Sequence, residues 1–353
     1  MINLYKNLIN SFFKLIYGKI TKLKNIKYSN ELRIYHIKSK QYNLKLYAIK
    51  KGRVFTDCNT NVAYITNNKL INGISYQQNK HKIANINYNS TLLKGTNKFK
   101  NKYNGTVFSA VQGSSGNNYW HWLFDILPKI EILKKKNLLN KIDYFYLPNK
   151  NKYILNSLKI YGVSENKIIN SSTNKHIEAD RILAFEHFYF KKGIIQDQFK
   201  YIPKWLLNLL FSNFLNKKKK IKKKNKIFID RSDSRFKHFQ IQNQNSIIKY
   251  LKTKNFSIVK LSDLNFYEQI YLFNNAKVIV GPHGAGFANI VFCKPNTKVY
   301  EIITPAHSDL KAIPSLCTKR KLVYKKILSK KMKGKNIHSS FIFIDLNKIK
   351  EYF

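Results

Sequence analysis

The stretch NFYEQIYLFNNAKVIVGPHGAGFANIVFCKPNTKVYEI (265–302) decides the fold of this chain. The apolar run KVIV (277–280) predicts a buried strand after a helix over 267–275, and KVYEII (298–303) predicts a second strand after a helix. Strands that alternate with helices are typical of a parallel sheet with right-handed crossovers. Such sheets bind ligands beyond the carboxyl ends of their strands. A ligand is therefore expected at the loop GPHGAG (281–286).

This loop has the features of a phosphate-binding turn. Gly281, Gly284 and Gly286 permit a tight turn and a close approach of the backbone to a ligand. The helix predicted from about residue 286 would direct free N–H groups and a partial positive charge at a diphosphate. His283 adds a side-chain donor. The spacing G-x-x-G-x-G does not fit the dinucleotide fingerprint, and a purely structural turn is the alternative.

Two arginines follow the preceding predicted strand. In FIDRSDSR (228–235), Arg231 stands at the carboxyl end of the strand KIFID (226–230), and Arg235 comes four residues later. Guanidinium groups bind phosphate oxygens in a bidentate manner, so the pair suits a nucleotide diphosphate. The alternative is an arginine at a domain surface.

A third motif, NNYWHWLFDILPKIEIL (117–133), combines polar and aromatic residues on one predicted helix over 118–138. His121 and Asp125 are four residues apart and share a helix face. A polar pair among so many apolar side chains is either catalytic or a buried hydrogen bond that orients the helix. Pro128 predicts a kink, and the preceding loop is expected to shape an acceptor cleft.

The pattern along the chain predicts two α/β domains. Residues 31–95 indicate short strands, and 105–216 show the strand–helix alternation of the first domain, which spans 1–216. A lysine-rich linker (217–225) separates it from the second domain, 226–353, because its like charges repel one another and stay solvated.

Composition limits the partners of the chain. It holds 65 Lys+Arg against 18 Asp+Glu, a formal net charge of +47. The charge reflects either an anionic partner or the lysine-rich codon bias of an AT-rich genome. The three cysteines, Cys58, Cys293 and Cys317, are widely spaced, which disfavours a disulfide framework and a zinc site and fits a reducing cytoplasm.

The first twenty residues predict an amphipathic helix. Leu4, Leu8, Phe12 and Leu15 recur at helical spacing beside lysines. The segment is too polar for a signal peptide, and its apolar run is too short to span a bilayer. The helix either lies on an anionic membrane surface or packs on its own protein.

These motifs together resemble those of glycosyltransferase family 61. The helix–strand–glycine loop region and the aromatic His-x-x-x-Asp helix are both similar to family hallmarks, and Arg231 and Arg235 match its strand-end arginine motif. The similarity covers about residues 105–305. One departure stands in QIQNQNSII (240–248), which keeps Asn243 but lacks the Glu that usually follows. The matching positions around the glycine loop are Glu268–Gln269, Gly281–Gly286, Asn289, Phe292–Pro295 and Glu301.

The resemblance implies a GT-B architecture: two Rossmann-like domains with parallel sheets facing across a cleft, here preceded by a strand-rich N-terminal segment. It implies inverting transfer from a nucleotide-sugar, with a UDP-sugar expected, and no metal. The chain has no D-x-D triplet to hold a divalent ion and supplies cationic groups instead. The expected donor-binding residues are Arg231, Arg235, His283, Gly284, Ala285, Gly286, Asn289 and Glu301, the last at the ribose hydroxyls.

The proposed base is Asp125 or His121, with Asp125 slightly favoured. The expected acceptor is a glycan or lipid-linked glycan of a bacterial surface polysaccharide, in the cytoplasm or at the inner membrane face. Two alternatives remain: a basic nucleic-acid-binding protein, although no specific nucleic-acid motif is present, and a family member that binds glycans without catalysis.

Overall fold

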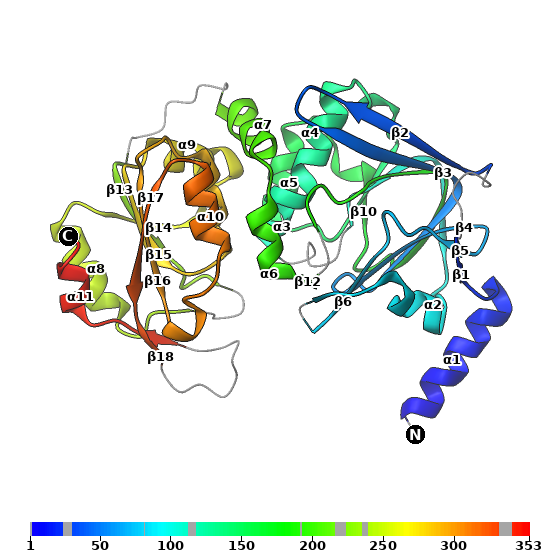
Figure 1. Ribbon diagram of the computed structural model, residues 1–353, viewed down its shortest axis with the longest axis horizontal. Helices are drawn as coiled ribbons and strands as arrows, with labels where there is room; N and C mark the ends of the chain where they lie inside the picture. Colours follow the sequence, from blue (N-terminus) through cyan, green and yellow to red (C-terminus); the bar gives the residue numbers. More distant parts are fainter. Residues whose placement is uncertain are drawn as a thin grey trace. The chain divides into compact units, whose positions relative to one another are not determined.

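The computed structural model divides the chain into two compact units, Met1–Trp205 (unit 1) and Leu206–Phe353 (unit 2). Figure 1 shows their helices and strands. The structure describes residues 2–23, 30–80, 82–111, 118–190, 193–215, 224–234, 239–331 and 341–353.

Unit 1 is built on one mixed sheet. Its described strands are β1 (Thr21–Lys22), β2 (Leu32–Lys38), β3 (Asn43–Thr56), β4 (Asn61–Thr66), β5 (Lys69–Leu70), β6 (Tyr76–Asn79), β7 (Lys82–Ile83), β8 (Asn101–Ser109), β9 (Tyr144–Leu147), β10 (Ile168–Asn170), β11 (His176–Phe185) and β12 (Gly193–Ile194). The main path runs β10-β9-β8-β11-β3-β4-β6-β7-β12. The neighbours from β10 to β11 are parallel, whereas β11 and β3 are antiparallel.

This sheet corrects one sequence-based expectation. The strands within 31–95 do not precede a separate parallel sheet, because β3 pairs with β11 over most of the length of β11. An edge strand with open N–H and C=O groups gains hydrogen bonds when another strand continues the sheet. Ile49, Val54, Val107, Ile177 and Ile182 are completely buried along this junction and form the centre of the core of unit 1.

The described helices of unit 1 include α1 (Ile2–Tyr17), α2 (Ser90–Lys94), α5 (Lys152–Lys159) and α6 (Ile195–Gln198). The aromatic motif forms one run of helix: α3 (Tyr119–His121), the π-helical segment η3 (Trp122–Ile126) and α4 (Leu127–Lys135). Within the described ranges, none of the helices combines the length and hydrophobicity needed to cross a bilayer.

Unit 2 contains a five-stranded parallel sheet. Its strands are β13 (Lys226–Asp230), β14 (Ser257–Lys260), β15 (Val278–Pro282), β16 (Lys298–Ile303) and β17 (Val323–Leu328). Their spatial order is β14-β13-β15-β16-β17, the 2-1-3-4-5 order of a doubly wound fold. The order reverses between β13 and β15, so the carboxyl ends of these two strands flank the position where such sheets bind ligands.

The sheet is accompanied by the small hairpin of β18 (Lys330–Lys331) and β19 (Ile342–Phe343). The described α-helices of this region are α7 (Lys204–Leu215), α8 (Gln244–Thr253), α9 (Phe266–Asn275), α10 (Ala312–Lys319) and α11 (Leu346–Lys350). The strands predicted from KIFID, FSIVKL, KVIV and KVYEII are confirmed. The helix predicted from about residue 286 is instead the 3₁₀ helix η8 (Ala285–Phe292). A 3₁₀ helix rises about 2.0 Å per residue, so this buried segment covers more distance than an α-helix would.

Candidate functional site

Arg231 and Gly284 meet at the switch point of the unit 2 sheet. Arg231 follows β13, and its guanidinium donates to the carbonyl of His283 and, at 3.2 Å, to the hydroxyl of Ser234. A Cβ at Gly284 would overlap the Nη1 atom of Arg231, so only glycine leaves room for this guanidinium. Burial lowers the pKa of Arg231 to about 10, opposed by the charge of Asp233, and the group stays cationic at neutral pH.

The glycine loop brings β15 close to β13. A Cβ at Gly281 would lie 2.8 Å from Cβ of Ile229, which is closer than ordinary packing permits. The four residues that follow Pro282, namely His283, Gly284, Ala285 and Gly286, are all partly accessible. A ligand that approaches the carboxyl end of the sheet would therefore meet a cationic guanidinium, an imidazole and a run of backbone N–H groups.

His283 is held by a chain of polar contacts across three strands. Its Nδ1 contacts the carboxylate of Glu301 on β16, and Tyr324 on β17 donates to the other Glu301 oxygen at 2.5 Å. Burial, followed by the charge of Glu301, raises the pKa of Tyr324, so this phenol remains a donor. With Nδ1 engaged by the carboxylate, Nε2 is the nitrogen of His283 that can meet a ligand.

Two of the predicted donor-binding residues, Asn289 and Glu301, are buried and bonded to other side chains of unit 2. Asn289 is completely buried and donates to Gln269 of α9 at 2.9 Å, which ties η8 to that helix. Glu301 is only 1% exposed and both its oxygens are engaged. The burial of both side chains leaves little of their surface open to a donor, and contact of Asn289 with the donor or of Glu301 with ribose hydroxyls stays a prediction. Asn289 holds η8 against α9, and Glu301 holds the ring of His283.

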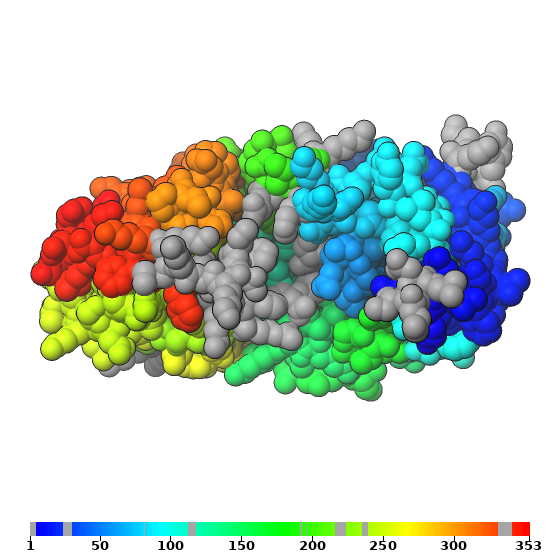
Figure 2. Space-filling model, turned by 90° about the horizontal axis from the view of Figure 1, so that it is seen from below, coloured from blue at the N-terminus to red at the C-terminus, as the bar shows by residue number. Residues whose placement is uncertain are grey.

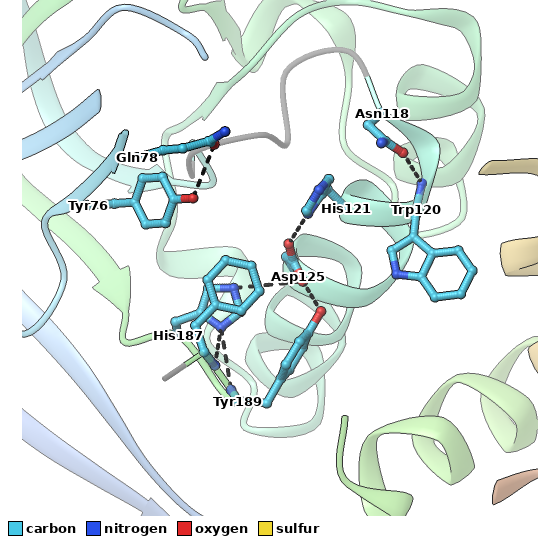
Figure 3. A network of polar contacts seen from close by, with 9 residues as sticks. Tyr76, Gln78, Asn118, Trp120, His121, Asp125, His187 and Tyr189 are labelled. Carbon is cyan, nitrogen blue, oxygen red and sulfur yellow. Dashed lines mark hydrogen bonds and ion pairs between the residues drawn. The ribbon is translucent and has the colours of Figure 1, made fainter. Parts of the chain in front are cut away.

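The polar pair predicted in unit 1 forms a hydrogen bond. His121 ends α3, Asp125 lies in η3, and Nδ1 of His121 is 2.6 Å from Oδ2 of Asp125. Asn118 caps the start of this helix by accepting from the amide of Trp120 at 2.9 Å. Figure 3 shows Asp125 at the centre of the network, with His121 and Tyr189 directed at its two oxygens.

Pro128 explains the π-helical segment. Proline lacks an N–H, and in an α-helix its ring clashes with the carbonyl four residues earlier, here that of Phe124. The chain avoids the clash by widening the preceding turns, and the amide of Leu127 donates to the carbonyl of Trp122, five residues back. The predicted kink at Pro128 is thus a local change of helical register directly beside Asp125.

Asp125 is an ionised carboxylate in a closed environment. Its side chain has no exposed surface, and the hydroxyl of Tyr189 donates to Oδ1. His187 stands 3.7 Å from the same oxygen through Nε2. Burial alone would raise the pKa of Asp125, but the charge and hydrogen bonds of His121 and His187 hold it well below its usual range.

The neighbouring groups remain in defined protonation states. Burial lowers the pKa of His187 to about 4 against the attraction of Asp125, so His187 is neutral at pH 7. Its Nδ1 accepts from the amide of Phe190 at 3.1 Å, which leaves the proton on Nε2, the nitrogen nearest Asp125. Burial also lowers the pKa of Lys129 to about 8, opposed by the charges of Asp125 and Glu186.

This arrangement suits proton transfer through His121. A carboxylate on Nδ1 fixes that proton and leaves Nε2 to accept another, and it stabilises the imidazolium that forms. The side chain of Asp125 has no exposed surface and both its oxygens are bonded, whereas the side chain of His121 keeps 6% of its surface exposed. This favours His121 over Asp125 as the candidate base. Among the described residues, no group of three or more His, Cys, Asp or Glu is arranged to hold a metal ion.

The sequence reasoning missed His187 and Tyr189. They lie in EHFYF (186–190), immediately after β11. Because β11 is parallel to β8, and the aromatic motif follows β8, the carboxyl ends of both strands meet at one edge of the sheet. A histidine and a tyrosine at a strand end were the available signal. Arg235, most of the lysine-rich linker and residues 112–117 of the predicted acceptor loop lie outside the described residues.

Comparison with protein families finds a match that spans both units. A family model described as Glycosyltransferase 61 matches residues 119–300, more than half of the chain. The matched region begins within the aromatic motif of unit 1 and ends on β16, one residue before Glu301. It therefore includes His121 and Asp125 as well as Arg231, His283 and Gly284, but not Glu301 or Tyr324. A search of curated proteins found no match.

Proposed function

Because the chain belongs to glycosyltransferase family 61, we propose that it transfers a sugar from a nucleotide-sugar donor to a glycan acceptor with inversion at the anomeric carbon and without a metal ion. The observation that carries the proposal is the meeting of Arg231, His283 and Gly284 at the switch point of a doubly wound sheet. A nucleoside diphosphate is the ligand whose charge suits this edge.

The donor diphosphate would bind to unit 2. Arg231 and Nε2 of His283 would contact phosphate oxygens, joined by backbone N–H groups at Gly284, Ala285 and Gly286. Arg235, four residues beyond Arg231, is proposed as a second cationic contact. Charge builds on the diphosphate as the bond to the sugar breaks, and fixed cationic groups stabilise that charge in the transition state.

His121 would act as the base. Its Nε2 would take the proton of the acceptor hydroxyl while the oxygen attacks the anomeric carbon, and the diphosphate leaves from the opposite face of the sugar. Asp125 would hold the tautomer of His121 and stabilise the imidazolium. The proposal requires the two units to face each other in a GT-B arrangement, as the family resemblance implies.

The proposed identities of the donor and the acceptor rest on the charge of the chain and on the resemblance to the family. We propose a UDP-sugar as donor and a glycan or lipid-linked glycan of a surface polysaccharide as acceptor. The net charge of +47 would favour the approach of an anionic donor or of a phosphate-bearing lipid-linked acceptor.

A thermal-shift panel of nucleoside diphosphates, run in EDTA on the full chain, tests the donor site. A ligand at about 100 times its Kd stabilises the folded state by about 2.7 kcal/mol, which raises the Tm by roughly 5 °C or more. We expect one nucleotide to do so for the wild type, and Arg231→Ala to abolish the rise.

Gly284→Ala makes the test specific. Its Cβ would displace the guanidinium of Arg231, so the single variant should lose the Tm rise as Arg231→Ala does. Without nucleotide, the double variant Arg231→Ala, Gly284→Ala should have a Tm no lower than that of Arg231→Ala alone. The reason is that the overlap between the new Cβ and the guanidinium is then gone. A nucleotide-induced rise that survives in Arg231→Ala would remove this arginine from the donor site.

A further inference from the structure

Helix α1 is fixed to unit 1 by one side only. Phe13 is buried and packs edge-on against Phe99 at a ring distance of 5.0 Å. Tyr17 stacks on Phe13, and its hydroxyl accepts from the amide of Lys100 at 3.1 Å. Immediately after the helix, Ile20 is buried in the core and β1 pairs with β5. The helix therefore has a defined orientation on the unit.

The opposite side of α1 is apolar and exposed. Its apolar residues occur at positions i, i+3, i+7, i+10 and i+11, which places them on one face of the helix. Leu8 is 63% exposed and Leu15 is 86% exposed, although leucine is normally a buried residue. In Figure 2 the dark blue atoms of α1 lie at the molecular surface. The residues of this exposed face are Tyr5, Leu8, Phe12, Leu15 and Ile16.

The apolar surface extends beyond the helix. Phe99 is 68% exposed and its ring lies 6.4 Å from that of Phe12. Between them runs a shallow groove with a volume of about 490 Å³, lined mainly by apolar atoms of α1 and of residues 97–99. We call the exposed face of α1 together with Phe99 the α1 surface. A contiguous exposed apolar surface on a folded protein indicates a binding partner.

The two segments that form the α1 surface carry charge of one sign, and Glu178 of β11 pairs with Lys100 at the end of one of them. These segments, residues 2–23 and 84–100, contain no Asp or Glu. Lys6, Lys14 and Lys19 on or beside α1, and Lys94 and Lys98 on the neighbouring segment, are exposed. A second copy of this chain would bring the same positive charge against them and would be repelled. An anionic surface would be attracted.

We propose that the α1 surface docks unit 1 on a lipid bilayer that contains anionic phospholipid. An amphipathic helix with an apolar face and flanking lysines binds in the plane of the bilayer interface, where apolar side chains enter the acyl boundary and lysines contact headgroup phosphates. This inference concerns docking alone and does not rest on the transfer reaction, since it is measured without donor or acceptor.

Vesicle sedimentation of the full chain tests the proposal. We expect binding to vesicles of phosphatidylcholine with about three tenths phosphatidylglycerol, and at least roughly tenfold weaker binding to phosphatidylcholine alone. Replacing Leu8, Phe12 and Leu15 together by Ser should weaken binding at least roughly tenfold. Lys6→Gln with Lys14→Gln should weaken it roughly 30-fold.

Matched controls separate the α1 surface from general effects. Ile194, Val323 and Leu328 are exposed apolar residues elsewhere, and replacing these three by Ser should leave vesicle binding unchanged. Lys348→Gln with Lys350→Gln on α11 is the control for charge. The proposal is overturned if the wild type ignores anionic vesicles, or if the Leu8, Phe12, Leu15 variant binds them as the wild type does. It is equally overturned if that variant changes only the oligomeric state in sedimentation velocity, which would identify a second copy as the occupant.

Discussion

At the scale of single residues, the tautomer of His121 depends on one buried carboxylate. Asp125→Asn would place an amide opposite Nδ1 of His121, so Nδ1 becomes an acceptor and the ring proton moves to Nε2. A protonated Nε2 cannot accept a proton from the acceptor hydroxyl. We expect Asp125→Asn and His121→Ala each to lower turnover by roughly 10²-fold or more, measured with the nucleotide-sugar that the thermal-shift panel identifies.

The same variants should keep the nucleotide-induced rise in Tm, because the proposed donor site is made by residues of unit 2. Asp180→Asn, at an exposed carboxylate of unit 1, is the matched control and should retain turnover. Near-native turnover in Asp125→Asn would show that His121 is not the base or that its tautomer has no role.

Local spacing predicted the His121–Asp125 contact, because residues four apart on a helix are neighbours. The rest of the network could not be predicted in this way. His187 and Tyr189 come from a strand end more than sixty positions away, and only the pairing of β11 with β8 brings them to Asp125. The burial of Glu301 could not be predicted either: the residue lies within the apolar strand KVYEII, but its enclosure depends on Tyr324 of the next strand.

At the scale of elements, unit 2 was readable because its buried parallel strands are short, continuous apolar runs such as KIFID and KVIV. Unit 1 was harder. Its parallel strands resemble those of unit 2 in sequence, but nothing local shows that β3 will continue their sheet in the antiparallel direction. The π-helical register at Trp122–Ile126 was also beyond local patterns, although Pro128 marked the position.

Pro128→Ala tests whether this register positions the dyad. Alanine supplies an amide and removes the ring clash with the carbonyl of Phe124, so the segment can tighten toward i→i−4 bonding. Tightening would rotate Asp125 relative to Tyr189 and His187, which contact it from another segment, and so disturb the carboxylate that holds His121. We expect turnover to fall at least roughly tenfold while the Tm changes by only a few degrees, since the gained hydrogen bond offsets the lost rigidity of proline.

Lys135→Ala, an exposed change at the far end of the same helix, should affect neither turnover nor the Tm. If Pro128→Ala retains full turnover, tertiary packing alone holds the dyad in place and the π register is incidental.

At the scale of the whole molecule, stability depends on groups that stay neutral inside a strongly cationic chain. His176 is completely buried at the start of β11, and its Nδ1 donates to the carbonyl of Lys98 at 2.8 Å. The rings of Phe55 and Tyr17 pack edge-on against it. Burial lowers the pKa of His176 to about 4, with the Lys98 carbonyl opposing and the charges of Arg53 and Lys100 adding to the shift.

The direction of the pH effect follows from that lowered pKa. Between about pH 4 and 6.5 the unfolded chain binds a proton at His176 that the folded chain does not, so the free energy of unfolding rises with pH in this window. The contribution is complete above about pH 6.5 and is lost as the pH falls toward 4. Its full size is about 3 kcal/mol, of which about 2 kcal/mol is lost by pH 5.

Tryptophan fluorescence can follow this loss in unit 1, because all three tryptophans, Trp120, Trp122 and Trp205, belong to that unit. Urea unfolding gives the free energy of unfolding at pH 7 and at pH 5. We expect the loss of this free energy between pH 7 and pH 5 to be about 2 kcal/mol smaller in His176→Gln than in the wild type. Charge repulsion and His187, whose pKa is also lowered to about 4, act equally in both proteins and cancel in this difference. An unchanged difference would mean that His176 is protonated in the folded protein, and that the positive charges of Arg53 and Lys100 do not keep it neutral.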